Sequence, residues 1–310
     1  MNQSQSPVYR PALGFALAFT TAVLWGVLPV FLKLSLMAMD SATITTYRFY
    51  SAALVVLAVL LWRKQFPRIS ALDGRGWFVC VVAAAMLVVN YVATVEGLVY
   101  LNPESVQVLM QIAPFLLMIG GIFIYREVFT RKQLVGAITL MAGLLLFFYQ
   151  RIPMILSSSA ESPVGLVFVI IAAVCWAAYA LCQKPLLSAL HARQLTFLIY
   201  ILGGSMLLPF AELGDLHGMN ALQLWALLFC CANTLVAYGA FTHAMGIWEA
   251  SKVSAVIALA PLFAILSTEW AINIWPDIFT SSELDWVAYI GAGMVIVGSM
   301  LAALGRSQRT

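Results

Sequence analysis

The sequence predicts an all-α integral membrane protein with ten transmembrane helices, built as two inverted five-helix repeats with both termini in the cytoplasm. The composition, the spacing of the apolar runs and an internal repeat support this fold class. Of the 310 residues, 63% are hydrophobic and 9% are charged, whereas a soluble domain carries roughly 25% charged residues. So few charges cannot cover a surface that faces water, and we therefore expect lipid around most of the chain.

Several other classes of protein fit the composition poorly. The net charge is +3, and no basic tract suited to nucleic acid is present. The five cysteines fall inside apolar runs and lack the spacing of a metal site or a disulfide framework. A glycine-rich phosphate-binding loop is also missing. We therefore expect no cofactor, no metal and no enzymatic activity.

The apolar runs place the helices. Crossing a bilayer core takes about 20 apolar residues in a helix. The first run starts at Pro11 and is longer than the apolar part of a signal peptide. Asn102-Pro103-Glu104 has the pattern of a helix start and opens the fourth run, with an acid in its first turn on the outer side of the membrane. The ten runs cover residues 11–36, 42–62, 76–96, 103–125, 133–149, 164–184, 195–213, 222–245, 251–274 and 284–305.

The charges between these runs predict their orientation. With ten spans, both termini and the even-numbered loops lie on one side of the membrane. All of the 16 Lys and Arg residues fall on that side except Lys33, Arg48 and Arg151. Cytoplasmic loops of membrane proteins are enriched in Lys and Arg. Both termini are therefore predicted to be cytoplasmic.

The two halves of the chain contain matching residues. At an offset of 151, Trp25 matches Trp176 and Lys33 matches Lys184. At an offset of 147, Tyr91 matches Tyr238 and Ala113-Pro114 matches Ala260-Pro261; at 155, Gly136-Ala137 matches Gly291-Ala292. The small drift in offset is typical of changes in loop length. Two repeats, over residues 11–150 and 163–305, explain these matches.

A repeat with an odd number of helices places the second copy upside down relative to the first. Inverted repeats are typical of secondary transporters, which bind substrate near the middle of the membrane where irregular helices of both halves meet. Pro114 and Pro261 each stand near mid-helix, where proline removes a backbone hydrogen bond. The matched prolines therefore predict helix kinks close to a substrate site.

Several motifs occur in the same order as in a known family. They are LWGVLPVFLK (24–33), YRF (47–49), IAPFLLMIGGIFIY (112–125) with the following REVFTRKQLVGA (126–137), CWAAYALCQK (175–184), ALAPLF (258–263) and GAGMVIVG (291–298). Together they resemble the drug/metabolite transporter (DMT) superfamily, in particular its EamA-type members with ten helices in two EamA repeats. The resemblance covers nearly the whole chain.

This resemblance implies a transporter in the bacterial inner membrane that exports amino acids or similar small polar metabolites by alternating access. The expected partners are a small-molecule substrate, the lipid bilayer, protons as a coupling ion and a second copy in a homodimer. One alternative is an exchanger of phosphorylated or sugar-linked metabolites, which requires several basic residues facing one cavity. An alternative of another class is an integral-membrane enzyme that modifies lipids, which requires clustered acids or histidines.

Basic residues inside the spans are the first candidates for function. Arg48 lies about 9 Å into the second span at 1.5 Å per residue. Three roles are open for it: contact with a substrate carboxylate, pairing with a gating acid such as Glu96 or Glu269, and snorkelling to the outer headgroups. Lys33 and Lys184 either mark the two membrane boundaries or belong to gates on opposite faces.

Proton coupling has two further candidates. Glu269 and His243 are titratable groups within predicted spans. Glu269, however, neighbours Trp270 and Trp275 and fits an interfacial aromatic belt equally well. His243 stands near the inner end of its span. Whether either group couples transport to protons is left open by the sequence.

Uncharged polar and aromatic residues at membrane depth complete the predicted site. The polar group either makes hydrogen bonds between helices, each worth about 0.6 kcal/mol, or forms the wall of a polar cavity. Three aromatic residues either supply the apolar part of that wall or serve in packing. The polar residues are Asn90, Tyr91, Gln107, Gln111, Asn233 and Tyr238, and the three aromatics are Trp25, Trp176 and Tyr179.

Overall fold

The computed structural model describes residues 11–67, 72–125, 130–149, 163–187, 189–248, 253, 256–279 and 284–304. Within these ranges every regular element is a helix. Six helices are long and apolar enough to cross a membrane, and shorter apolar helices accompany them. The predicted repeat ends at 150 and 305 lie outside the described residues.

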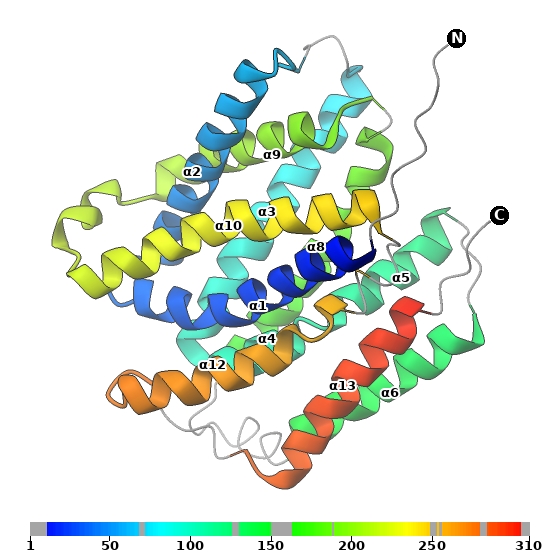
Figure 1. Ribbon diagram of the computed structural model, residues 1–310. Coiled ribbons are helices and arrows are strands. Elements are labelled where there is room, and N and C mark those ends of the chain that lie inside the picture. The colour runs from blue at the N-terminus through cyan, green and yellow to red at the C-terminus, as the bar shows by residue number, and fades with distance from the viewer. Residues whose placement is uncertain are drawn as a thin grey trace.

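The elements follow one another as shown in Figure 1. Five are candidate spans or contain one: α1 (Pro11–Ser35), α2 (Ser41–Trp62), α3 (Gly74–Tyr100), α8 (Pro163–Leu186) and α10 (Ala221–Ile247). The sixth candidate span, Ala192–Phe210, is formed by α9 (Ala192–Leu207) together with the 3₁₀ turn that follows it. The other α-helices are α4 (Pro103–Leu109), α5 (Ile112–Tyr125), α6 (Arg131–Phe147), α12 (Ala260–Ile274) and α13 (Trp286–Leu304). Two short 3₁₀ turns, η2 (Leu208–Phe210) and η3 (Leu213–Gly218), connect α9 to α10.

Polar side chains fix several helix starts. Asp40 accepts a hydrogen bond from the Thr43 amide at 2.8 Å, and Asp73 accepts one from the Gly76 amide at 2.7 Å. Such caps satisfy amide groups that the first helical turn leaves without partners. Asn102 also occupies an N-cap position, but its side chain makes no capping hydrogen bond. The fourth run therefore starts where it was predicted to start, without the expected side-chain cap.

The helices of the two halves are interleaved. In the pairs with the most extensive contact, α1 lies against α10, α3 against α8, α2 against α9 and α6 against α13. The α1–α10 and α6–α13 pairs are seen side by side in Figure 1. Each pair joins a helix from before residue 150 to one from after residue 163. The apolar face of one half is thus buried against the other half.

The α6–α13 pair is in direct backbone contact. A Cβ atom added at Gly136 would lie 2.7 Å from the carbonyl oxygen of Gly298, and one added at Gly298 would lie 2.7 Å from that of Gly136. Gly143 and Gly291 face each other in the same way, at 2.8 Å in both directions. The earlier glycine of α6 meets the later glycine of α13, so the two helices run antiparallel.

Two more contacts are related by the sequence offsets. Gly14 at the start of α1 lies against Trp248, directly after the end of α10. Gly165 at the start of α8 lies against Leu101, directly after the end of α3. Gly14 and Gly165 match at the offset of 151, and Leu101 and Trp248 match at the offset of 147. The same contact between the halves therefore occurs twice, with the roles of the two halves exchanged.

Both halves contain an interrupted helix. The sequence predicted one helix over 103–125, but the helical hydrogen bonding is broken at Met110 and Gln111 between α4 and α5. In the second half, Ala258 and Leu259 form a turn directly before α12. Pro114 and Pro261 stand in the first turn of the helix after each break, where a proline needs no amide partner. The two prolines are matched at the 147-residue offset, and the breaks are matched to within one residue of it.

Candidate functional site

A cavity of about 290 Å³ lies between the two halves. Its walls come from α1, α2, α3, α8 and α10, from both interrupted segments, and from α6 and α13. Its aromatic lining consists of Trp25, Tyr91, Phe115, Trp176, Tyr238 and Phe241. Its polar lining consists of Arg48, Asn90, Thr94, Gln107, Gln111, Asn233 and Ser299. Pockets with a mostly apolar wall and a few placed polar groups are typical of small-molecule sites.

The structure brings together the residues that the sequence predicted as substrate-binding, with the exception of Tyr179. Tyr179 is buried beside the cavity, in an apolar cluster with Phe49 and Tyr200. The two interruptions reach the same cavity, because Ala113 and Phe115 flank Pro114 and Ala260 precedes Pro261. Substrate binding itself stays a prediction for these residues.

Arg48 is the basic residue of the described cavity wall. Its side chain is 3% exposed, so it does not reach the membrane surface. Its Nε donates a hydrogen bond to the Thr234 hydroxyl at 3.0 Å, and its guanidinium carbon lies 4.4 Å from the centre of the Tyr91 ring. A cation over an aromatic face is favourable, particularly away from water. Among the described residues, neither Glu96 nor Glu269 contacts this guanidinium, so its charge lacks a carboxylate partner there.

Asn233 is a second polar residue of the cavity wall and carries a hydrogen-bond acceptor. It precedes Thr234 on α10 and is 2% exposed. Its amide nitrogen donates to the carbonyl oxygen of Leu24 at 2.6 Å, which leaves its Oδ1 as the free atom. Within the described chain, Oδ1 has no hydrogen-bond partner. A buried acceptor without a donor is costly and is uncommon in native proteins.

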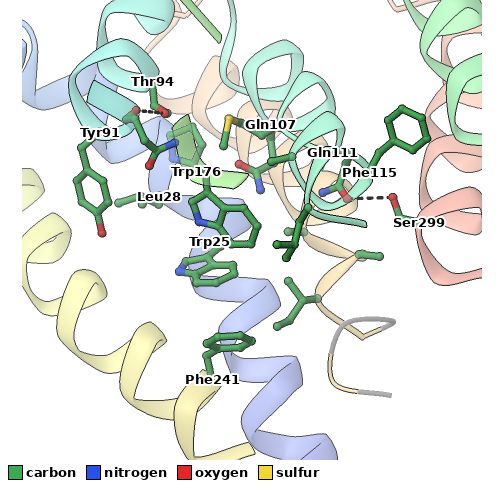
Figure 2. Close-up of a pocket in the computed structure, with 18 of the residues that line it drawn as sticks. Trp25, Leu28, Tyr91, Thr94, Gln107, Gln111, Phe115, Trp176, Phe241 and Ser299 are labelled. Carbon is green, nitrogen blue, oxygen red and sulfur yellow. Dashed lines mark hydrogen bonds between the residues drawn. The ribbon is translucent and has the colours of Figure 1, made fainter. Parts of the chain in front are cut away.

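The other amides form part of the wall nearer to the helix break. Gln111 accepts a hydrogen bond from the Ser299 hydroxyl at 3.0 Å and so connects the break to α13. Asn90 donates to the carbonyl oxygen of Ala172 at 2.9 Å and connects α3 to α8. These two residues therefore also make the bonds between helices that the sequence analysis considered. Figure 2 shows Gln107 and Gln111 on one side of the paired indoles of Trp25 and Trp176.

Aromatic rings make up the opposite part of the wall. The Trp25 ring lies 5.3 Å from the ring of Tyr238 and 5.7 Å from that of Phe241, measured between centroids. Phe241 is labelled below Trp25 in Figure 2. Such edge and tilted contacts hold the rings in defined positions. The result is a rigid apolar surface facing the amide groups.

Of the five predicted coupling or gating residues, the side chain of Lys184 lies outside the part of the chain that the structure describes, and the other four do not line the described cavity. Lys33 is half-buried near the end of α1, and Lys184 lies within α8. Glu96 is half-buried and accepts a hydrogen bond from the Ser41 hydroxyl. His243 and Glu269 are exposed on the outside of α10 and α12. The exposure of Glu269 is consistent with a place in an interfacial aromatic belt, and that of His243 with a place near the end of its span.

Some lining residues were missed by the sequence analysis. Phe115, Phe241 and Ser299 are ordinary residues of apolar helices, and only the packing of the helices shows that they face a cavity. Glu104 was predicted in the first turn of the fourth span, and the structure confirms this position, since it is the second residue of α4. Its burial was not predicted: Glu104 is 1% exposed.

Comparison with known proteins gives consistent results. The sequence model of the EamA-like transporter family matches residues 12–149 and again residues 163–304. The chain is 37% identical to the uncharacterized inner membrane transporter YhbE of Escherichia coli K12 over 297 residues, which covers 96% of this chain and 92% of that protein. It is 33% identical to an uncharacterized transporter of Haemophilus influenzae over 296 residues, covering 96% of each.

More distant similarities point the same way. An uncharacterized transporter of Archaeoglobus fulgidus is 25% identical over 293 residues, which covers 93% of this chain. A solved crystal structure superposes with a TM-score of 0.64 at 16% sequence identity, covering 97% of this chain and all of the other. That similarity establishes a shared fold.

Proposed function

This chain belongs to the EamA-like transporter family of the DMT superfamily, and we propose that it is a secondary transporter of the bacterial inner membrane. We propose further that it exports amino acids or closely similar small metabolites that carry a carboxylate. The observation that carries the proposal is Arg48, a buried cation in the cavity wall. Ten spans with both termini in the cytoplasm are part of the proposal, supported by the distribution of Lys and Arg.

Arg48 supports a negatively charged substrate. A guanidinium is the preferred protein partner of a carboxylate because its donors match the two oxygens. In the described part of the chain, the bond to Thr234 uses Nε, which leaves the terminal nitrogen atoms for a ligand. An unpaired charge inside a membrane protein is unfavourable and usually marks a functional site. A carboxylate in the cavity would neutralise it.

Asn233 supports an amino group on the same substrate. Its free Oδ1 requires a donor, and it neighbours Thr234, to which Arg48 is bonded. An α-amino acid carries its ammonium donor on the carbon next to the carboxylate. One molecule would thus satisfy both the charge of Arg48 and the acceptor of Asn233.

The aromatic wall refines the predicted substrate. The family resemblance implied small polar metabolites as substrates, whereas much of the cavity lining is apolar. A cavity of about 290 Å³ lies at the lower end of the usual range for ligand sites. We therefore propose a small substrate whose apolar part rests against Trp25, Trp176 and Phe241.

Alternating access would use the interleaved halves. Interrupted helices of two inverted repeats meet at the substrate site in many secondary transporters. Here the α4–α5 break and the turn before α12 both reach the cavity. Rocking the halves against each other would expose this site first to one side and then to the other. Solute gradients would supply the driving force.

The alternatives gain less support from the lining. An exchanger of phosphorylated or sugar-linked metabolites is expected to present several cations, and the described wall contains Arg48 alone. A lipid-modifying enzyme is expected to present paired acids or histidines. The described wall contains neither an acid nor an imidazole. Both alternatives stay as outcomes of the test below.

The test is transport into proteoliposomes that contain the purified full-length protein. A panel of amino acids, their deaminated analogues, sugars, sugar phosphates and aromatic compounds is measured with and without a pH gradient. We expect movement of amino acids, and a loss of at least tenfold in Arg48→Ala. Arg63→Ala is the matched control, because Arg63 stands at the exposed end of the same helix, over Trp62.

Each outcome decides a separate point. If no compound moves under any gradient, the proposal of a transporter is wrong. If only sugar phosphates move, the exchanger alternative replaces it. If Arg48→Ala keeps both rate and substrate preference, the carboxylate site lies elsewhere.

A further inference from the structure

Glu104 is a buried carboxyl group without a partner. Its side chain is 1% exposed, and neither carboxylate oxygen has a hydrogen-bond partner within the described chain. Burying an ionised carboxylate without hydrogen bonds or a counter-charge is strongly unfavourable. A neutral carboxyl avoids most of that cost.

The surroundings of Glu104 are apolar. Two residues later, Val106 belongs to a fully buried cluster that also contains Leu101, at the end of α3, and Ile265 of α12. Thr268, one helical turn after Ile265, is 3% exposed, and its hydroxyl also lacks a hydrogen-bond partner in the described structure. The region where α4 packs against α12 thus holds two polar groups with unused bonding capacity.

The elements packed against α4 are α1, α3, α8 and α12. Tyr289, near the start of α13, interacts electrostatically with both Glu104 and Glu269. Glu269 of α12 is exposed, and Glu96 of α3 accepts from Ser41. None of the described groups makes a hydrogen bond to Glu104. The other charged or titratable residues of these helices are Lys33 of α1; Arg75, Cys80, Tyr91 and Tyr100 of α3; and Cys175, Tyr179, Cys182 and Lys184 of α8.

Glu104 lies just outside the cavity. The cavity extends to Phe241, Ala302 and Ala137, which lie near the end of α10, the end of α13 and the start of α6. Gln107, one turn after Glu104 on α4, lines the cavity, whereas Glu104 does not. Glu104 is therefore buried beyond the cavity wall, at the end of the cavity where α4 starts.

From this placement we propose that Glu104 is a proton-binding site that couples the closing of this end of the transporter to protons. When the α4–α12 region separates, water reaches the carboxyl group, and its proton leaves to that water. When the region closes, the carboxylate takes a proton from water and is buried as a neutral group. The proposal rests on the proposed transport function, because it requires this end to open.

The first test detects the proton directly and needs no substrate. The purified protein in lipid nanodiscs is titrated while the infrared band of a protonated carboxyl group is recorded. We expect a band that disappears as the pH rises and that is absent in Glu104→Gln. Glu104→Asp should keep a band with a shifted midpoint, which guards against loss of fold. Glu212→Gln is the matched control, since Glu212 is an exposed acid before η3.

The second test measures coupling. A pH gradient is imposed across proteoliposomes, and the accumulation of the amino acids identified by the panel is followed. In Glu104→Gln, we expect the accumulation driven by the pH gradient to fall at least tenfold. Counterflow without a gradient should persist. A wild-type protein without the infrared band at any pH, or a Glu104→Gln protein that still responds to the gradient, would overturn the proposal. Absence of transport with the band intact would instead refute the proposed function alone.

Discussion

Gly143 of α6 and Gly291 of α13 face each other with no room for a side chain on either. A Cβ atom at either position would lie 2.8 Å from the other's carbonyl oxygen. Small residues allow membrane helices to approach this closely, and dispersion contacts then stabilise the pair. The seam joins the last helix of one predicted repeat to the last helix of the other.

Substituting Gly291 by alanine is expected to destabilise the protein. The new methyl group would collide with backbone atoms at the end of α6, and overpacking of this kind typically costs about 1–3 kcal/mol. Gly293→Ala is the matched control, because a Cβ atom there meets no atom within 4 Å. The measurement is thermal unfolding in detergent. Equal melting temperatures for the two variants would contradict the close contact.

Thr234→Val is expected to weaken substrate binding without unfolding the protein. It removes the hydroxyl that accepts from Arg48 Nε at 3.0 Å, and hydrogen bonds to charged groups are worth about 1.5–3 kcal/mol. We expect affinity to fall by about tenfold to a hundredfold. Thr20→Val is the control, because the Thr20 hydroxyl bonds within its own exposed helix. A loss of similar size in both variants would point to general damage.

Asn233→Leu is expected to remove discrimination between amino acids and their deaminated analogues. The substitution deletes the free Oδ1, which we propose accepts from the substrate ammonium. Affinity for the amino acid should fall about tenfold, the size expected for one hydrogen bond to a charged group. The analogue without an amino group serves as the internal control. Competition assays in proteoliposomes decide the point, and an equal loss for both compounds would refute this role.

His243→Gln and Glu269→Gln are expected to transport with an unchanged pH profile. Both side chains are exposed and lie outside the cavity lining. The measurement is initial rate against pH for each variant beside the wild type. A displaced pH profile in either variant would restore that residue as a coupling group.

Tyr149→Phe is expected to change how stability depends on pH. The Tyr149 hydroxyl donates to Asp285 at 2.7 Å, and the Ala288 amide donates at 2.8 Å. The Tyr149 bond is the main cause that lowers the pKa of Asp285 below its usual 3.8, and the amide bond is the next. A lowered carboxyl pKa adds stability above the usual pKa, and this stability is lost as the pH falls through the folded value.

The variant should therefore melt at a lower temperature than the wild type near neutral pH. The difference in melting temperature between the variant and the wild type should narrow as the pH falls below 3.8. Tyr50→Phe is a control, because the Tyr50 hydroxyl meets Ser205 and no carboxylate. A gap that does not change with pH would mean that the Tyr149 bond is not linked to the charge of Asp285.

The sequence predicted the positions of most helices within a few residues. The second span was predicted at 42–62 and is found at Ser41–Trp62, because a polar Asp40 precedes a long apolar run. A kink in 103–125 was predicted at Pro114, but the helix breaks earlier, at Met110 and Gln111. Likewise, the seventh span was predicted to continue to residue 213, whereas α9 ends at Leu207 and a 3₁₀ turn follows. Hydropathy describes whether a segment prefers lipid or water. It carries little information on backbone hydrogen bonding within a span.

The candidate site was predicted in part for a similar reason. Matching of the halves singled out Trp25, Trp176, Tyr91 and Tyr238, and all four line the cavity. Whether Arg48 faces inward or toward lipid depends on which helices cover it, and the sequence left that open. Glu104 was predicted in the first turn of the fourth span, but the sequence did not indicate that its side chain is buried. Its burial follows from the packing of α4 against distant helices.

The interleaving of α1 with α10 and of α3 with α8 has a consequence for biogenesis. The ribosome completes the first five predicted spans before the partners of α1 and α3 exist. Those helices must wait in the bilayer with their contact surfaces uncovered until translation passes residue 247. The two repeats therefore mature as one cooperative unit late in synthesis, although domains of many proteins fold one after another.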